Sequence, residues 1–148
     1  MKAILQRVTE AKVKINNGET RSIGKGLVIL LGVGVNDAEK DAEKLAEKIV
    51  NLRIFPNEEG KFDKCLLDIC GEALVVSQFT LYGDCEKGRR PDFTKAARPE
   101  KAVPLYERFI KCLKEFKVKT ETGEFAADMM VEIHNDGPVT ISLDSNDI

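Results

Sequence analysis

The sequence predicts one α+β domain over residues 1–148, with a strand-rich sheet or barrel-like core that two helices cover. Most apolar residues fall in short runs or alternate with polar ones, as they do in strands. Two longer segments instead repeat apolar residues at helical spacing. With 148 residues, 43% of them hydrophobic, the chain has the length and apolar content of a single core, and it contains no linker or internal repeat.

The first part of the chain predicts strands. Ile4 and Val8 occupy even positions whereas the apolar residues of segment 11–15 occupy odd ones, so a β-bulge or break is expected near residues 9 and 10. Asn17-Gly18 predicts a turn. The apolar run from Leu27 to Leu31 predicts a buried strand at the centre of the sheet.

Two segments predict helices that cover this sheet. The first begins after Asn36 or Asp37, either of which could cap it, and extends to Val50. The second runs from Glu100 to Phe116. The apolar faces consist of Ala38, Ala42, Leu45, Ala46, Ile49 and Val50 in the first helix and Ala102, Tyr106, Phe109, Ile110 and Leu113 in the second.

Two polar segments interrupt the remaining strands. Ala73 to Leu81 predicts a strand that ends in Ser77-Gln78-Phe79-Thr80, with Gln78 and Thr80 on one face. Hydroxyl and amide groups at this end could line a pocket, or the strand could simply emerge into solvent. Near the C-terminus, Asn135-Asp136-Gly137-Pro138 separates two alternating segments, which predicts a hairpin turn.

The net charge and the small number of histidine and cysteine residues argue against several functions. The formal charge is −2, so a general DNA-binding surface is not expected, although the segment Gly83 to Arg98 carries +2 and is either a local nucleic-acid contact or a solvated loop. The sole histidine, His134, is expected on a strand surface. The cysteines match no zinc spacing, so neither a metal nor a cofactor is expected; they are Cys65, Cys70, Cys85 and Cys112.

The N-terminal residues lack the apolar core of a signal peptide, and the longest apolar run, Leu27 to Val35, is interrupted by glycines. The sequence therefore predicts a cytoplasmic protein with no membrane contact.

The segments Ser77 to Tyr82 and Asn135 to Thr140 closely resemble the two signature motifs of the D-aminoacyl-tRNA deacylases, also called D-tyrosyl-tRNA deacylases. Supporting matches extend along the whole chain, at Gln6-Arg7-Val8, Gly26-Leu27-Val28, Lys87 to Pro91, and Gly123-Glu124-Phe125 with Met129. One departure is Ala126, where the family often has glycine; a methyl group there would slightly reshape the pocket wall.

The resemblance implies a homodimer that hydrolyses the ester at the 3′ end of D-aminoacyl-tRNA, and of mischarged glycyl-tRNA, at sites on the subunit interface. It implies a cis Gly137-Pro138 peptide that enters the partner's pocket and rejects L-amino acids. Ser77, Gln78, Phe79 and Thr80 would form the catalytic strand end. Met129 would bind substrate, and Arg7 would orient the Gly-Pro loop.

Thr80 has been considered a nucleophile in this family, but no histidine base accompanies it in the motif. The 2′-hydroxyl of the terminal adenosine is therefore expected to position or activate water, with Thr80 as a positioning residue and Phe79 holding the adenine. Two other classes remain open. The chain could be a non-catalytic tRNA- or nucleotide-binding module of the editing type, or an unrelated esterase that uses His134.

Overall fold

The computed structural model describes residues 1–16 and 18–148. Asn17 lies outside the described residues, and with it the turn predicted at Asn17-Gly18. The elements in chain order are β1 (Lys2–Ile15), β2 (Thr20–Ile23), β3 (Gly26–Gly32), α1 (Glu39–Val50), β4 (Phe55–Pro56), β5 (Phe62–Lys64), β6 (Glu72–Ser77), the 3₁₀ helix η1 (Phe79–Tyr82), α2 (Pro99–Glu115), β7 (Lys119–Thr122) and β8 (Met129–Asp144).

The main sheet is mixed and nearly closes on itself. Its strand order is β2-β1-β3-β6-β7, and β8 pairs with β1. β1 is antiparallel to its three partners, whereas β3, β6 and β7 are mutually parallel neighbours. Arg21 of β2 donates a 2.8 Å hydrogen bond to the carbonyl oxygen of Thr122 in β7, so the two ends of the strand order meet. The predicted α+β barrel-like core is confirmed, and β3 occupies the central position expected for it.

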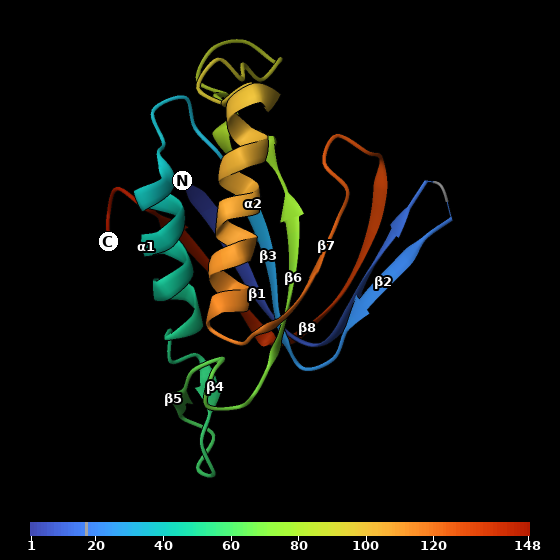
Figure 1. Ribbon diagram of the computed structural model, residues 1–148, viewed down its shortest axis with the longest axis vertical. Coiled ribbons are helices and arrows are strands. Elements are labelled where there is room, and N and C mark those ends of the chain that lie inside the picture. The colour runs from blue at the N-terminus through green and yellow to red at the C-terminus, as the bar shows by residue number, and fades with distance from the viewer. Residues whose placement is uncertain (17) are drawn as a thin grey trace.

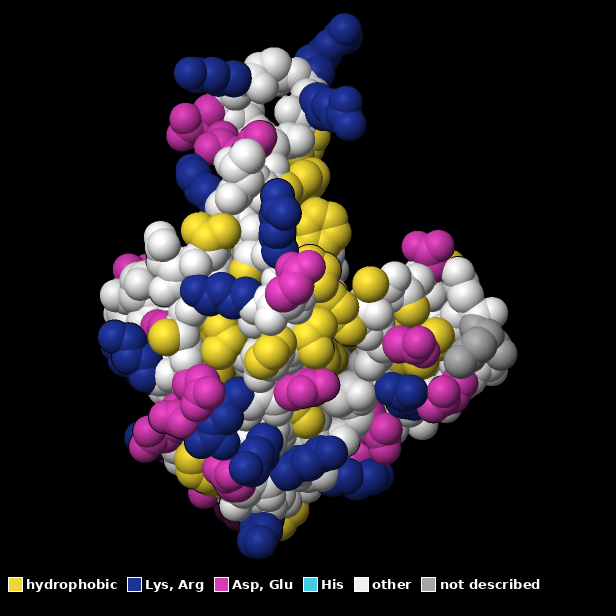
Figure 2. Space-filling view, turned by 45° about the horizontal axis from the view of Figure 1, so that its top comes forward, with side chains coloured by type: hydrophobic (Ala, Val, Ile, Leu, Met, Phe, Trp, Pro, Cys, Tyr) yellow, Lys and Arg dark blue, Asp and Glu magenta, His cyan; other side chains and the backbone are white. Residues whose placement is uncertain are grey.

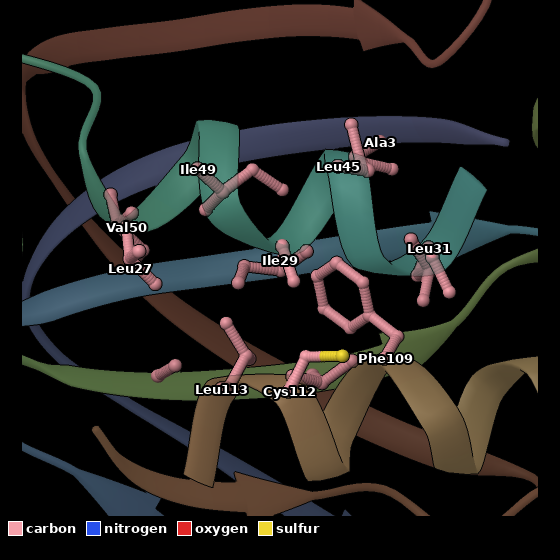
Figure 3. Close-up of a cluster of buried hydrophobic side chains, with 14 of the residues drawn as sticks. Ala3, Leu27, Ile29, Leu31, Leu45, Ile49, Val50, Phe109, Cys112 and Leu113 are labelled. Carbon is pink, nitrogen blue, oxygen red and sulfur yellow. The ribbon is translucent and has the colours of Figure 1, made fainter. Parts of the chain in front are cut away.

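The two helices lie side by side over one face of the sheet (Figure 1). Figure 3 shows Ile29 of β3 between the side chains of Ile49 in α1 and Phe109 in α2. All three side chains are fully buried. Burial of one such side chain contributes about 1.5–3 kcal/mol to folding, so the apolar stripes of the two helices fix them against the sheet.

The start of α1 differs from the prediction. Ala38, not Asn36 or Asp37, is the N-cap residue, and its backbone N–H donates a 2.9 Å hydrogen bond to the carboxylate of Asp41. Asp37 cannot cap the helix because its carboxylate is occupied elsewhere. It accepts a 2.6 Å hydrogen bond from the backbone N–H of Gly34 and pairs with the ammonium group of Met1 at 2.9 Å.

The strand predicted over residues 73–81 ends four residues early. β6 stops at Ser77, and Phe79 to Tyr82 form one 3₁₀ turn. The backbone N–H of Gln78 still donates to the carbonyl oxygen of Leu31 at 2.8 Å, but β3 ends one residue after Leu31. Without a neighbouring strand to continue the ladder, the chain turns, so the expected alternation of Gln78 and Thr80 on one sheet face is wrong.

The prediction of a C-terminal hairpin is also wrong, because β8 is one long strand whose two halves both pair with β1. Val8 pairs with Asn135 and Gln6 pairs with Thr140, so residues 136–139 bulge out opposite Arg7. Register shifts on β1 lie between Gln6 and Glu10, which confirms the break expected near residues 9 and 10. We call residues 136–139 the Gly-Pro loop.

Candidate active site

A cavity of about 690 Å³ opens at the C-terminal end of β6. Its walls come from three segments: residues 76–79 around the end of β6, residues 93–99 leading into α2, and residues 125–131 leading into β8. Figure 2 shows apolar side chains gathered along the face below the topmost loop. The cavity combines this apolar lining with a few polar groups, the usual composition of a small-molecule site.

The end of β6 supplies polar groups to this cavity. Ser77 and Gln78 line it and are half-buried, and the Gln78 side-chain amide donates a hydrogen bond to the hydroxyl of the exposed Thr80. The first backbone N–H groups of a helix have no acceptor within the helix. Within residues 1–16 and 18–148, those of Phe79 and Thr80 have none elsewhere either. Two free donors therefore lie beside the cavity, where they could stabilise an oxyanion.

Aromatic rings form the mouth of the cavity. Phe79 is 55% exposed and packs edge-on against Phe93, with 5.1 Å between the ring centroids. Phe93 was not among the residues predicted from the sequence, since it follows a charged loop and belongs to no periodic segment. Exposed aromatic faces of this kind stack readily on nucleic-acid bases.

The opposite wall consists of residues 125–129. The sulfur of Met129 lies 3.3 Å from the backbone nitrogen of Glu124 and covers Gly123, where an added Cβ would come within 2.8 Å of the sulfur. Ala126 has a φ angle of +62°, a left-handed conformation that favours glycine. Behind this wall, Tyr106 donates a 2.9 Å hydrogen bond to the carbonyl oxygen of Val75, and burial raises the pKa of its phenol.

The Gly-Pro loop lies outside this cavity. Gly137 and Pro138 are exposed, and neither lines the cavity. Their peptide bond is cis. Asn135 closes the loop at its base, because its side-chain amide donates 3.0 Å hydrogen bonds to the carbonyl oxygens of both Arg7 and Val139. This function of Asn135 was not predicted from the sequence.

Arg7 packs beneath the Gly-Pro loop. Its Nε lies 3.2 Å from a carboxylate oxygen of Asp136, at an ion-pair distance but without hydrogen-bond geometry. Its Nη1 donates a 2.7 Å hydrogen bond to the carbonyl oxygen of Ile54. A Cβ placed on Gly137 would lie 3.1 Å from Nη2 of Arg7 and 2.8 Å from Cγ2 of Val139. The guanidinium therefore fills the space directly under the glycine.

The predicted site residues thus form two groups in one chain. Ser77, Gln78, Phe79 and Met129 line the cavity with Thr80 beside it, whereas Arg7, Gly137 and Pro138 lie together elsewhere. His134 belongs to neither group: it lines a separate groove and lies 3.3 Å from Glu10. Among the described residues, no cluster of three metal-ligating side chains occurs.

The nearly closed α+β sheet and the partly apolar cavity at the end of β6 have the architecture of a small α+β domain that binds a ligand at a strand end. A sequence model of the D-Tyr-tRNA(Tyr) deacylase family matches residues 4–144. A D-aminoacyl-tRNA deacylase of Thermosipho melanesiensis is 56% identical over 149 residues, covering 100% of this chain and 99% of the relative. The chain therefore belongs to the D-Tyr-tRNA(Tyr) deacylase family, whose members are hydrolases.

Solved structures agree with this fold. The structure of the c-Myc DNA Unwinding Element Binding Protein superimposes with a TM-score of 0.90 at 43% identity, covering 97% of this chain and 98% of that one. A structure described as a "probable eukaryotic D-amino acid tRNA deacylase" gives a TM-score of 0.81 at 17% identity with the same coverage. Among the described residues, no helix is long and apolar enough to cross a membrane.

Proposed function

We propose that this chain hydrolyses the ester between a D-amino acid and the 3′ end of its tRNA, in the cytoplasm, and that it also acts on mischarged glycyl-tRNA. The observation that carries the proposal is the cavity at the end of β6, which brings Ser77, Gln78, Phe79 and Met129 together beside free backbone donors. These are the residues on which the sequence resembles the family, and the family match covers residues 4–144.

The reaction needs little chemical assistance because an aminoacyl ester is already activated. A water molecule attacks the carbonyl carbon, the ester C–O bond breaks, and the ribose oxygen leaves with a proton. The N–H groups of Phe79 and Thr80 are suited to stabilise the developing oxyanion. The 2′-hydroxyl of the terminal adenosine places the water, the Gln78 amide holds the Thr80 hydroxyl, and the ring of Phe79 stacks on adenine.

Selection against L-amino acids is assigned to the Gly-Pro loop of a second subunit. Gly137 and Pro138 are exposed and lie outside the cavity of their own chain, so they reach a substrate only in the cavity of another copy. Gly137 has no Cβ, which allows its backbone to approach the substrate α-carbon closely. An L side chain would collide with this backbone, whereas a D side chain points away and glycine has none.

A deacylation assay tests the activity. The same tRNA, charged with D-tyrosine or with L-tyrosine, is incubated with the protein, and release of the amino acid is followed. The proposal expects rapid loss of D-tyrosine and no acceleration for L-tyrosine over the uncatalysed rate. Binding of both charged tRNAs without turnover of either would instead favour the non-catalytic, editing-type module.

Subunit complementation tests the shared site. Phe79→Ala impairs the cavity, and Gly137→Ala fills the space above Arg7 and obstructs the loop. Each variant dimer is expected to be inactive. In an equal mixture half of the dimers are heterodimers. Each heterodimer has one intact cavity facing one intact loop, so about a quarter of wild-type activity should return.

Sedimentation tests the dimer itself, and each protein should give about twice 16.5 kDa. No recovery in a mixture of confirmed heterodimers would contradict the cross-subunit site.

A further inference from the structure

We propose that the loop between η1 and α2 carries a basic rim, formed by Lys87, Arg89, Arg90 and Arg98, that binds backbone phosphates at the acceptor end of tRNA. This inference rests on the proposed function, because it assumes that the aminoacyl end lies in the neighbouring cavity. The surface accounts for substrate affinity, whereas the cavity and the Gly-Pro loop account for chemistry and chirality.

The charge distribution supports such a surface. The segment Gly83 to Arg98 carries a formal charge of +2, whereas the rest of the chain carries −4. The four residues of the basic rim are all exposed. Within the part of the chain that the structure describes, none of the four forms an ion pair. Figure 2 shows Lys and Arg side chains projecting around the end of the molecule where this loop lies.

The acidic residues of the loop are engaged internally, which leaves these cations facing solvent. The backbones of Asp84 and Asp92 exchange two hydrogen bonds of 2.8 and 2.9 Å. The Asp84 carboxylate pairs with Lys95 at 2.9 Å, and the Asp92 carboxylate accepts a 2.9 Å hydrogen bond from the backbone N–H of Thr94. Asp92 and Glu86 are both exposed and neither forms an ion pair among the described residues, but the Asp92 carboxylate is held by Thr94, which leaves Glu86 near the tip.

The base of the loop is fixed to the sheet beside the cavity. The backbone N–H of Val35 donates to the carbonyl oxygen of Lys95 at 3.1 Å, and that of Ala97 donates to the carbonyl oxygen of Val33 at 2.9 Å. Phe93, Ala96, Ala97 and Pro99 of the same segment line the cavity. The loop that carries the cations is therefore anchored beside the cavity, and we infer that the phosphodiester chain of a 3′ end bound in the cavity runs along it.

An exposed cation without a carboxylate partner is suited to bind phosphate, and an arginine can donate two parallel hydrogen bonds to one phosphate group. Such contacts release counterions, so the logarithm of the binding constant falls by about 0.9 per contact for each unit of log salt concentration. A protein with an overall charge of −2 needs a local cluster of this kind to bind RNA.

The test replaces the three cations at the tip together, as Lys87→Gln, Arg89→Gln and Arg90→Gln. Arg98 is left unchanged because it is the N-cap residue of α2. The matched control replaces three exposed lysines on the outer faces of the helices, as Lys40→Gln, Lys48→Gln and Lys111→Gln. Two substrates are compared, D-tyrosyl-tRNA and the D-tyrosyl ester of adenosine, which has no phosphate.

The rim variant should have a lower kcat/KM than wild type on the charged tRNA and an unchanged kcat/KM on the adenosine ester. The control variant should match wild type on both substrates. Between 50 and 200 mM salt, the ratio of wild-type to variant kcat/KM on tRNA should shrink by about 40-fold, as three lost phosphate contacts require. Equal losses on both substrates, or no loss on either, would overturn the basic rim.

Binding of an uncharged acceptor-stem minihelix separates this inference from the proposed function. Weaker, less salt-dependent binding by the rim variant supports the basic rim even if no turnover occurs, whereas unchanged binding overturns it. A DNA duplex of the same length serves as competitor. If it displaces the minihelix at equal concentration, the surface binds nucleic acid in general and its assignment to the tRNA acceptor end is wrong.

Discussion

The side-chain amide of Asn135 in β8 donates a hydrogen bond to the carbonyl oxygen of Arg7 in β1 at 3.0 Å, at the base of the Gly-Pro loop. The same amide reaches Val139 at the far side of the loop, also at 3.0 Å. One side chain thus joins both ends of the loop to the middle of β1, so loop shape and sheet pairing depend on each other.

Asn135→Ala should destabilise the protein and impair chiral selection. Two hydrogen bonds are lost, each with a net contribution of about 0.5–1.5 kcal/mol, so unfolding in urea should show a loss of about 1–3 kcal/mol. Deacylation of D-tyrosyl-tRNA should fall, and the ratio of D to L turnover should fall with it. Asn51→Ala, which removes an exposed 2.9 Å hydrogen bond at the end of α1, is the control. An unchanged D to L ratio would show that the two Asn135 hydrogen bonds are not needed for selection.

Ala126→Gly should stabilise the protein. Ala126 has a φ angle of +62°, where an L-residue is disfavoured by about 1–2 kcal/mol, partly offset by the greater chain entropy of glycine. A net gain of about 0.5–1 kcal/mol in the free energy of unfolding is expected. Ala127→Gly, in the same cavity wall but without a positive φ angle, should instead destabilise by a similar amount, because glycine gives the unfolded chain more freedom. Destabilisation by both variants would contradict the left-handed conformation.

Thr80→Ala should keep kcat within about tenfold of wild type, because loss of a true nucleophile reduces kcat by several orders of magnitude. The Thr80 hydroxyl accepts its hydrogen bond from an amide, and Asp128 is the only ionisable residue in the cavity lining that the structure describes. Acid quenching during turnover, followed by mass measurement, provides a direct check. An aminoacyl ester on Thr80 would exclude direct attack of water on the tRNA ester.

Burial of Tyr106 should lower the free energy of unfolding at alkaline pH. Burial raises the pKa of its phenol in the folded state, whereas the unfolded chain titrates near the ordinary value of about 10. Its contribution is therefore complete below pH 10 and declines as the pH rises, by up to about 1.4 kcal/mol per pH unit. Tyr106→Phe should show a shallower decline in urea midpoints above pH 10. Parallel profiles would mean that Tyr106 ionises equally easily in both states.

The sequence predicted the parts of the fold that depend on local patterns. The apolar run of Leu27 to Leu31 and the apolar stripes of the two helices are each readable within one segment, and they became β3, α1 and α2. The phase change near residues 9 and 10 also gave the correct position of the β1 irregularity.

The errors arose where a distant partner decides the conformation. Asn135 to Pro138 have the residues of a turn, but turn residues equally suit a loop that bulges from one long strand. Only the pairing of β8 with β1 on both sides distinguishes the two. Likewise, Asp37 suits a helix cap by residue type, but its carboxylate binds the ammonium group of Met1 and the backbone N–H of Gly34 instead. The cavity residues at Ser77 to Phe79 and Met129 come from segments that only the closed sheet brings together.

Pairing on both sides of the Gly-Pro loop has a thermodynamic consequence. Residues 129–135 and 140–144 are each paired with β1, and Asn135 bonds to Val139, so both ends of residues 136–139 are fixed in place. Ordering a free loop residue on binding opposes association by about 1–2 kcal/mol. A loop whose ends are already fixed loses less of this freedom, so the chiral selection proposed for it would need no closing motion.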